Sequence, residues 1–340
     1  QRYDDVRLVG APPSSIGKYG ADTDNWMWPR HTGDFSMFRV YADKNNNHAQ
    51  ISDDNVPYAP KMSLSISLAG TKEGDFSMVF GFPGTTDEYL PGSSVKQTLE
   101  VINPARIEIR ETKLAVLDKK MRADAATRIK YASKYARTSN AYKKWIGQNI
   151  GLKETKALDK KRRYEIEFLY NISKNDALWD KHGNILNELD GLYNQLEPYA
   201  QARNYFLEVG YYGIESFNYT YNYLQLVRLS NSGAAEEKLK AQAERLASGV
   251  DGFYKNYDAM LDKKVFAGLM PLYQANVESQ LQPSQVYQVE NWSSKADELY
   301  GSSLFTQADS PEQLKELLGE STEDIVKALE NDPLFKMMSD

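Results

Sequence analysis

The sequence has 340 residues, a formal net charge of −6 and no cysteine. The missing thiols exclude disulfides, thiolate zinc sites and a cysteine nucleophile. Acidic and basic residues are interspersed, so the chain has neither the basic footprint of a nucleic-acid-binding protein nor a polybasic membrane arm. No apolar run approaches the ~18 residues that a membrane-spanning helix needs. The length fits about two domains of roughly 150 residues each.

The first 90 residues carry a pattern typical of β-structure with loops. Apolar residues alternate with polar ones, or run together, in four segments separated by Gly, Pro, Asn and Asp clusters. These segments are DVRLVGA (5–11), FSMFRVYA (35–42), MSLSISLA (62–69) and FSMVFGF (76–82). Four such strands indicate part of an all-β barrel or sandwich. The pentapeptide GDFSM occurs twice, at 33–37 and 74–78, and we interpret the two copies as similar strand starts.

After a boundary between residues 88 and 97, the pattern becomes helical. A long segment over 105–136, opened by Pro104, has apolar residues at roughly helical spacing. Further helices are predicted over 154–173, 183–207, 234–261, 311–318 and 322–330. Pro311 is expected in a first turn, and Ser321 is expected to cap the last of these helices with Glu323 or Asp324 closing the box. We therefore predict an α+β chain, with a β-rich domain over 1–90 and an all-α domain over 91–340.

The chain has three histidines, which limits the ways in which it could supply a serine triad. A triad needs a base histidine, an acid that orients it, and a serine beside backbone donors. His48 and His182 lie in polar segments where we expect solvent exposure, and His31 lies only three residues from Asp34. None of them is predicted to be the base. Ser232 in NSG imitates a serine-protease nucleophile, but its segment is predicted to be a turn between helices.

The stretch DTDNWMWPRHTGDFS, residues 22–36, concentrates aromatic, charged and imidazole side chains in one loop. Its aspartates and His31 do not follow the spacing of a calcium hand, and HExxH is absent from the sequence. We predict neither a metal nor a cofactor. Asp34 follows a glycine and precedes a strand, where a carboxylate could point into a cleft and accept a hydrogen bond from an imidazole. From the residue alone, a turn cap is favoured over this role.

These residues also carry a family resemblance. RYDDVRLVGAPPSSIGKYGADTDNWMWPRHTGDFSMFRVYA, together with KEGDFSMVFGFPG, resembles the bacterial serine dipeptidyl peptidases of family 46, the group of dipeptidyl-peptidases 7 and 11. The resemblance implies part of a chymotrypsin-like double β-barrel with a large helical domain inserted. It implies that Asp34 is the catalytic aspartate. It also implies that Asn25, the backbone carbonyl of Trp26, and Asn140 hold the free α-amino group of the substrate.

The chain departs from that family in three places. It has SNAYK around Asn140 where the family usually has ANYWK, and it has neither the TNHHC-like segment of the triad histidine nor the GNSGSP segment of the serine. We therefore expect an internal fragment that contributes the aspartate loop and the helical cap, and that is inactive alone. Asp75, in the second GDFSM, is the rival to Asp34, but it lacks the preceding DNWMWPRHT.

The resemblance sets the expected activity and location. The parent enzyme is expected to release dipeptides from oligopeptides with a free N-terminus, in the periplasm or cell envelope, after secretion by a signal peptide outside this sequence. A homodimer is left open, as is the choice between acidic and hydrophobic second residues. The alternatives are a non-catalytic peptide-binding module related to these peptidases and, on the tyrosines alone, a carbohydrate-binding helical protein.

Overall fold

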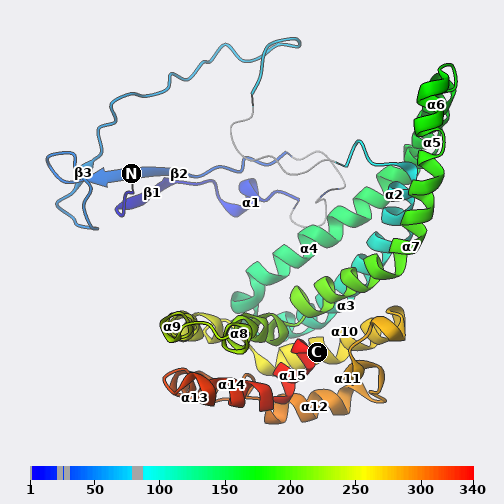
Figure 1. Ribbon diagram of the computed structural model, residues 1–340. Coiled ribbons are helices and arrows are strands. Elements are labelled where there is room, and N and C mark those ends of the chain that lie inside the picture. Colours follow the sequence, from blue (N-terminus) through cyan, green and yellow to red (C-terminus); the bar gives the residue numbers. More distant parts are fainter. Residues whose placement is uncertain (1, 21–25, 27–30, 79–86) are drawn as a thin grey trace. The chain divides into compact units, whose positions relative to one another are not determined.

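The computed structural model describes residues 2–20, 26, 31–78 and 87–340, and the chain divides into two compact units. The N-terminal unit comprises residues 1–89, and the helical unit comprises residues 90–340. The elements of both units are labelled in Figure 1. The chain is therefore mostly helical, with a small three-stranded antiparallel sheet near its N-terminus.

The sheet of the N-terminal unit has the order β1-β2-β3, with strands β1 (Val6–Gly10), β2 (Met37–Ala42) and β3 (Val56–Pro57). A short helix, α1 (Ser14–Gly17), lies in the connection between β1 and β2. The pairing of β1 with β2 includes Val6 opposite Val40 and shifts register between Leu8 and Gly10. Such a bulge bends a strand and increases its local twist. It lies where β1 leads into the connection that carries the motif loop, residues 22–36.

The first two predicted strands are present, but the prediction of a strand over 62–69 is wrong. Residues 62–69 form no ladder, and their apolar side chains are exposed, with Leu64 at 92%, Ile66 at 88% and Leu68 at 95%. A strand is defined by hydrogen bonds to a neighbour, and alternation of apolar and polar residues cannot supply that neighbour. Residues 76–78 of the fourth predicted strand are likewise not in a strand, and the rest of that prediction lies outside the described residues.

The helical unit is a succession of helices joined by short connections. Two stretches are π-helical, η1 (Thr98–Ile102) and η2 (Phe206–Tyr211), and one is a 3₁₀ turn, η3 (Ser279–Leu281). The α-helices are α2 (Gly92–Gln97), α3 (Asn103–Ala123), α4 (Ala125–Glu154), α5 (Ala157–Ile172), α6 (Asp176–His182), α7 (Ile185–Tyr205), α8 (Glu215–Asn231), α9 (Glu236–Tyr254), α10 (Ala259–Asn276), α11 (Ser284–Tyr287), α12 (Trp292–Ser302), α13 (Ser310–Leu317), α14 (Thr322–Asn331) and α15 (Pro333–Ser339).

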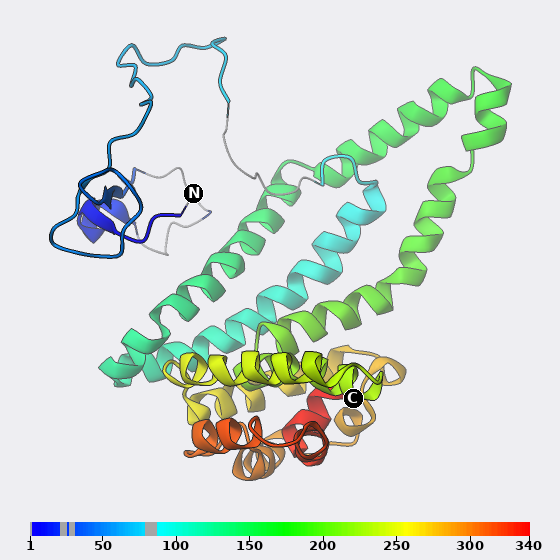
Figure 2. The same cartoon turned by 60° about the vertical axis from the view of Figure 1, so that its left-hand side comes forward.

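Within the helical unit, the long helices form an arm and the later helices form a bundle at its base. Figures 1 and 2 show α3, α4 and α7 running beside one another, with α5 and α6 at the far tip. Helices α8 to α15 gather at the other end (Figure 1). The bundle holds most of the buried apolar side chains, so it is the stable base from which the arm projects.

Two of the predicted helices are in fact pairs of helices. The segment predicted as one helix over 105–136 breaks at Asp124, whose extended backbone ends α3 and whose carboxylate accepts hydrogen bonds from the amides of Ala126 and Thr127. The segment predicted over 234–261 breaks before Asp258, which caps α10 through the amide of Leu261. Aspartate is a favoured N-cap because its carboxylate satisfies amides that the helix leaves unpaired.

Other helix signals are confirmed. Pro311 lies in the first turn of α13, and Ser321 caps α14 by accepting a hydrogen bond from the amide of Asp324. Asn231 ends α8, and Gly233 adopts a positive φ of 70° in the turn before α9. That left-handed backbone suits glycine, which has no Cβ to clash. The segment around Ser232 is therefore the predicted turn between helices.

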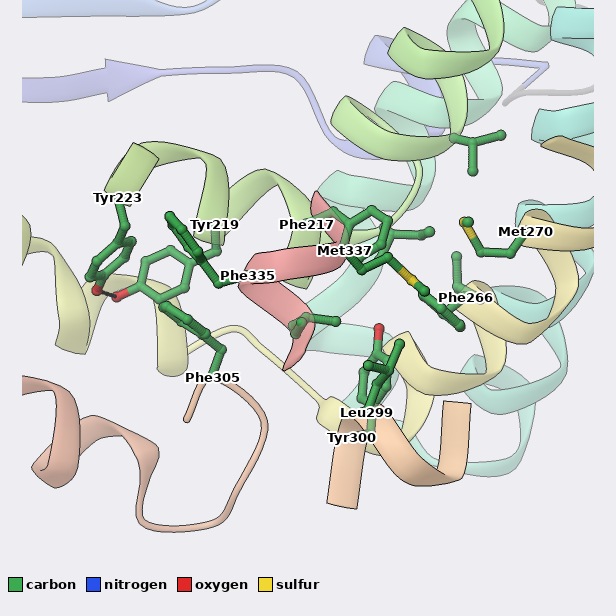
Figure 3. Close-up of a cluster of buried hydrophobic side chains, with 14 of the residues drawn as sticks. Phe217, Tyr219, Tyr223, Phe266, Met270, Leu299, Tyr300, Phe305, Phe335 and Met337 are labelled. Carbon is green, nitrogen blue, oxygen red and sulfur yellow. Dashed lines mark hydrogen bonds between the residues drawn. The ribbon is translucent and has the colours of Figure 1, made fainter. Parts of the chain in front are cut away.

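An aromatic cluster forms the centre of the base bundle (Figure 3). Tyr223 and Phe266 are fully buried, and the hydroxyl of Tyr223 bonds to that of Tyr219 at 3.0 Å. Phe266 lies edge-on to Phe217 and Tyr300, with ring centroids 5.6 and 5.7 Å apart. Edge-to-face pairs of this kind add to the stabilisation from area burial. The many tyrosines are thus partly explained by the core.

Candidate functional site

The connection from β1 to β2 contains α1 and the motif loop, and a hydrogen bond links α1 to the end of that loop. The amide of Gly33 donates to the carbonyl of Ile16 in α1 at 3.2 Å. A Cβ on Gly33 would lie 3.2 Å from Cγ2 of Ile16, and one on Gly17 would lie 3.3 Å from Cγ of Pro12. Gly33 therefore allows α1 to approach the end of the loop closely, and Gly17 allows the end of α1 to lie close to Pro12. This contact fixes the backbone immediately before Asp34.

Asp34 lies three residues before the first residue of β2, and its side chain is exposed to solvent. The strand sets the direction in which the chain leaves Asp34, and the Gly33 contact sets the direction in which it enters. An exposed carboxylate held from both sides can accept a hydrogen bond from a group brought to it. Asp75, at the matching position of the second GDFSM, instead accepts from the amide of Lys72 at 2.8 Å and so closes a local turn.

Trp26 has a backbone conformation that a bulky residue rarely adopts. Its φ is 64°, in the left-handed region, and its side chain is 53% exposed. Residues with such backbone strain cluster at ligand clamps and active sites. Asn25, the other residue predicted to bind the substrate amine in this loop, lies outside the described residues. So do Asp22 and Asp24, the aspartates weighed as metal ligands.

Asn140 belongs to the helical unit, on α4, and its side chain is exposed. The opposite side of α4 is buried, with Tyr131 at 1% and Thr138 at 7% exposure. Asn140 therefore projects from the surface of a helix whose other side is packed in the unit. Asp34 and Trp26 belong to the N-terminal unit, and Asn140 to the helical unit.

The three histidines do not form a triad among the described residues. His48 lies on the surface, where its Nε2 is 2.8 Å from the carboxylate of Asp4, and the side-chain amide of Gln50 donates to the same carboxylate at 2.9 Å. These hydrogen bonds, that of His48 first, lower the pKa of Asp4. His31 is exposed, whereas His182 is half-buried at the end of α6, which corrects the expectation that it would be solvent-exposed.

Sequence reasoning did not identify a buried polar cluster in the base bundle. Asp262 of α10 accepts hydrogen bonds from the hydroxyls of Tyr300 (2.8 Å) and Tyr257 (3.2 Å). Glu215, at the start of α8, forms an ion pair with Lys134 of α4. Burial raises the pKa of Glu215 and lowers that of the nearby Lys113. These contacts join helices that lie far apart in sequence, so no local pattern could reveal them.

A cavity of about 610 Å³ also lies in the helical unit. Its walls come from the end of α7, η2, α8, α10 and the segments around 280–286 and 337–340, and they are mostly aromatic, methionine and aliphatic side chains. Gln282, which lines it, has a buried side-chain oxygen with no hydrogen-bond partner. The motif loop belongs to the other unit, so the cavity does not include its residues. No helix in the described ranges is both long and apolar enough to cross a bilayer.

Comparison with known proteins identifies the family. The family model of peptidase S46 matches residues 1–340, the whole length of the chain. The chain belongs to the peptidase S46 family. It is 45% identical over 320 residues to the Asp/Glu-specific dipeptidyl-peptidase of Capnocytophaga gingivalis, covering 93% of this chain and 44% of that protein. It is 39% identical over 340 residues to dipeptidyl-peptidase 7 of Porphyromonas endodontalis, covering 99% of this chain and 40% of that protein.

A solved S46 structure has the same fold. The crystal structure of Porphyromonas endodontalis DPP11 in complex with the dipeptide Arg-Glu matches with a TM-score of 0.72 at 29% sequence identity, and the match covers 99% of this chain and 49% of that one. The chain thus spans about half the length of the relatives it matches, or less. Its family is the one that the motif loop predicted.

Proposed function

We propose that this chain is the aspartate-loop and helical-cap part of a serine dipeptidyl peptidase that releases dipeptides from the free N-terminus of oligopeptides. The match of the S46 family model over residues 1–340 carries the proposal. Its relatives include proteins named as dipeptidyl-peptidase 7 and as Asp/Glu-specific dipeptidyl-peptidase. The dipeptide bound in the DPP11 crystal structure is the size of product that such an enzyme releases.

In this proposal, Asp34 is the acid of the triad. It accepts a hydrogen bond from a histidine supplied by residues outside this sequence, which holds the imidazole in the productive tautomer and stabilises the imidazolium that forms. A serine, also outside this sequence, is the nucleophile. The exposed carboxylate of Asp34, fixed between the Gly33–Ile16 hydrogen bond and β2, supports this role. The chain would sit within a partial chymotrypsin-like barrel, completed by strands that it does not contain, with domains at 1–90 and 91–340.

The second part of the proposal is an amine clamp made by Asn25, Trp26 and Asn140. A dipeptidyl peptidase must measure two residues from a free ammonium group, and an ammonium taken out of water needs several acceptors. Two side-chain amide oxygens and the backbone carbonyl of Trp26 would supply them. The left-handed backbone of Trp26 supports the assignment, because it re-aims the backbone of the loop in a way that an extended residue would not.

The location follows the same proposal. An enzyme of this kind would act in the periplasm or cell envelope on oligopeptides that reach it there. This location rests on the family relationship.

The test uses the full-length enzyme and a pair of matched aspartates. Asp34→Asn should lower kcat by about 10⁴-fold, as loss of a triad acid does, whereas Asp75→Asn should leave kcat within about twofold. Both aspartates follow Gly and precede Phe-Ser-Met, so the comparison separates catalysis from local sequence. Fluorogenic dipeptidyl substrates with a free amine should be cleaved and their N-acetylated forms should not. If Asp34→Asn retains turnover, the triad assignment is wrong.

A further inference from the structure

Two arginines of α3 contact the ring of Trp145 in α4. The guanidinium carbon of Arg106 is 4.9 Å from the centroid of the Trp145 ring, and that of Arg110 is 4.7 Å from it. Arg106 and Arg110 are four residues apart, so they project from the same side of α3, one turn after the other. Trp145 follows Asn140 by five residues on the same helix. The pair of cations therefore fixes α4 near the residue proposed to bind the substrate amine.

Both arginines are themselves held by a third element. Arg110 donates through Nε to Oε2 of Glu208 at 2.8 Å, and Glu208, in η2, is only 5% exposed. Arg106 donates through Nε to the side-chain oxygen of Asn204 at 2.7 Å, and Asn204 donates to the carbonyl of Ile102 at 3.3 Å. These hydrogen bonds leave the guanidinium groups little freedom. The position of the Trp145 ring is therefore set by α3 and by the α7–η2 segment together.

Arg110 also reaches the backbone of α4 directly. Its Nη1 donates to the carbonyl of Thr138 at 3.4 Å, two residues before Asn140. Thr138 is buried, whereas Asn140 lies about 200° further round the helix and is exposed. Arg110 therefore contacts α4 on both sides of Asn140 along the sequence, at residue 138 and at residue 145, while leaving the amide side chain of Asn140 on the outer surface.

The geometry makes the position of Asn140 sensitive to these contacts. At the 5–6 Å radius of a helix with its side chains, a rotation of about 10° moves an atom by about 1 Å. A misplacement of about 1 Å in a substrate-positioning group can lower kcat/KM about 100-fold. An amide on one side of α4 can thus bind an ammonium well only if the other side of α4 is fixed.

We propose that Arg110 is a positioning residue for substrate binding, acting through Trp145 and Thr138 on Asn140, with Glu208 as its anchor. The inference rests on the proposed role of Asn140 in holding the substrate amine. Arg110 touches neither substrate nor reacting atoms in this assignment. Its effect should therefore fall on KM, because it changes how well Asn140 is placed for the ammonium and leaves the acyl-transfer groups alone.

The experiment is a double-substitution cycle in the full-length enzyme. Arg110→Lys keeps the charge but loses the planar fork that serves Glu208, Thr138 and the ring face at once. We expect KM for free-amine dipeptidyl substrates to rise about tenfold, with kcat within about twofold. The matched control is Arg122→Lys on the same helix, since Arg122 is 80% exposed and forms a surface ion pair with Asp118 at 2.7 Å. Its KM should not change.

The cycle is completed with Asn140→Ala. If Arg110 acts through Asn140, then Arg110→Lys should add less than about twofold to KM once Asn140 is replaced. A full tenfold effect in both backgrounds would overturn the positioning role. If Asn140→Ala leaves KM unchanged, the amine-binding role of Asn140 is wrong, which is a separate failure of the proposed function.

A second variant guards against loss of folding. Glu208→Gln keeps the shape and the acceptor oxygen of the anchor while removing its charge, so α3 and η2 should stay paired through the hydrogen bond to Arg110. It should raise KM in the same direction by a smaller factor, and that rise should also vanish in the Asn140→Ala background. A Glu208→Gln enzyme with a normal melting temperature and unchanged KM would overturn the proposal.

Discussion

Asp262 accepts a hydrogen bond from the backbone amide of Ser216 at 3.0 Å, although 46 positions separate the two residues. The other carboxylate oxygen accepts from the amide of Glu215 at 2.8 Å. A side chain of α10 therefore satisfies the first amides of α8, which the helix itself leaves without partners. Asp262 also accepts from two buried tyrosine hydroxyls, so one carboxylate joins α8, α10 and α12.

Replacing Asp262 with alanine should destabilise the helical unit strongly. Two amides and the hydroxyl of Tyr257 would lose their acceptor, and the hydroxyl of Tyr300 would keep only its hydrogen bond with Ser216. Each unsatisfied buried group costs about 1–3 kcal/mol, although such costs do not simply add. We expect the free energy of unfolding to fall by about 3–5 kcal/mol in urea titrations followed by far-UV circular dichroism. Asp118→Ala, which removes an exposed ion pair, should change it by under about 1 kcal/mol. Equal losses would contradict the assignment.

Glu215 gives the stability a predictable dependence on pH. Burial, and then the charge of Asp262, raise the pKa of Glu215 above its ordinary value of 4.5, while Lys134 acts in the opposite direction. The folded state then holds the proton more tightly than the unfolded state does. The contribution of Glu215 to the free energy of unfolding should therefore be greatest below about pH 4.5. It should decline as the pH rises from 4.5 through the raised pKa.

The measurement compares Glu215→Gln with the unsubstituted chain between pH 4 and 8. Glutamine cannot titrate, so the variant should lack this decline, and the difference between the two unfolding free energies should shift by up to about 1.4 kcal/mol for each pH unit of the window. Buried groups common to both proteins, such as Asp332, cancel in the difference. Two parallel curves would show that the pKa of Glu215 is not raised.

The contrast between predicted and observed features follows the range of the interactions involved. The cap of α14 at Ser321 depends on four consecutive residues, 321–324, and its prediction is confirmed. The break at Asp124 is equally local, but it lies in a continuous helical pattern with neither Gly nor Pro. The apolar periodicity alone therefore predicted one unbroken helix there. The prediction of a strand over 62–69 is wrong for the opposite reason. Its alternation of apolar and polar residues is strong, but the described sheet contains no neighbouring strand that pairs with it.

The candidate site divides in the same way. The family was identifiable because DTDNWMWPRHTGDFS is a contiguous stretch, and its roles for Asp34, Trp26 and Asn140 stay predictions. The ion pair between Arg110 and Glu208 joins residues 98 positions apart and has no local signature. The contacts of Arg106 and Arg110 with the Trp145 ring likewise have no local signature. Contacts of that kind depend on how helices pack, which a single sequence does not state.

Gly92 and Glu165 form a contact that can be tested from both sides. The amide of Gly92, at the start of α2, donates to the carboxylate of Glu165 in α5 at 2.6 Å. A Cβ at residue 92 would lie 3.1 Å from Oε2 of Glu165 and would push the carboxylate away. Gly92→Ala and Glu165→Ala should each lower the free energy of unfolding by about 1 kcal/mol, the worth of one hydrogen bond.

Because both changes break the same hydrogen bond, the double variant should lose much less than the sum of the two. Gly151→Ala is the matched control, since Gly151 lies in α4 and a Cβ there would meet nothing within 4 Å. That change should raise the free energy of unfolding by about 0.5–1 kcal/mol through helix propensity. Additive losses at residues 92 and 165 would argue against a shared contact.

Phe266 is the last test, because it lies at the meeting point of three aromatic neighbours in the base bundle. It is fully buried, and its ring centroid is 5.6 Å from that of Phe217, 5.7 Å from Tyr300 and 5.8 Å from Trp292. Phe266→Ala should lower the free energy of unfolding by about 3–5 kcal/mol, through lost burial and the cavity left among rings that cannot close in. Phe266→Leu should lose less, because it fills most of that cavity. Tyr164→Ala, at a side chain 70% exposed, should change the free energy by under about 0.5 kcal/mol, and a comparable loss there would mean that Phe266 does not lie at the centre of the core.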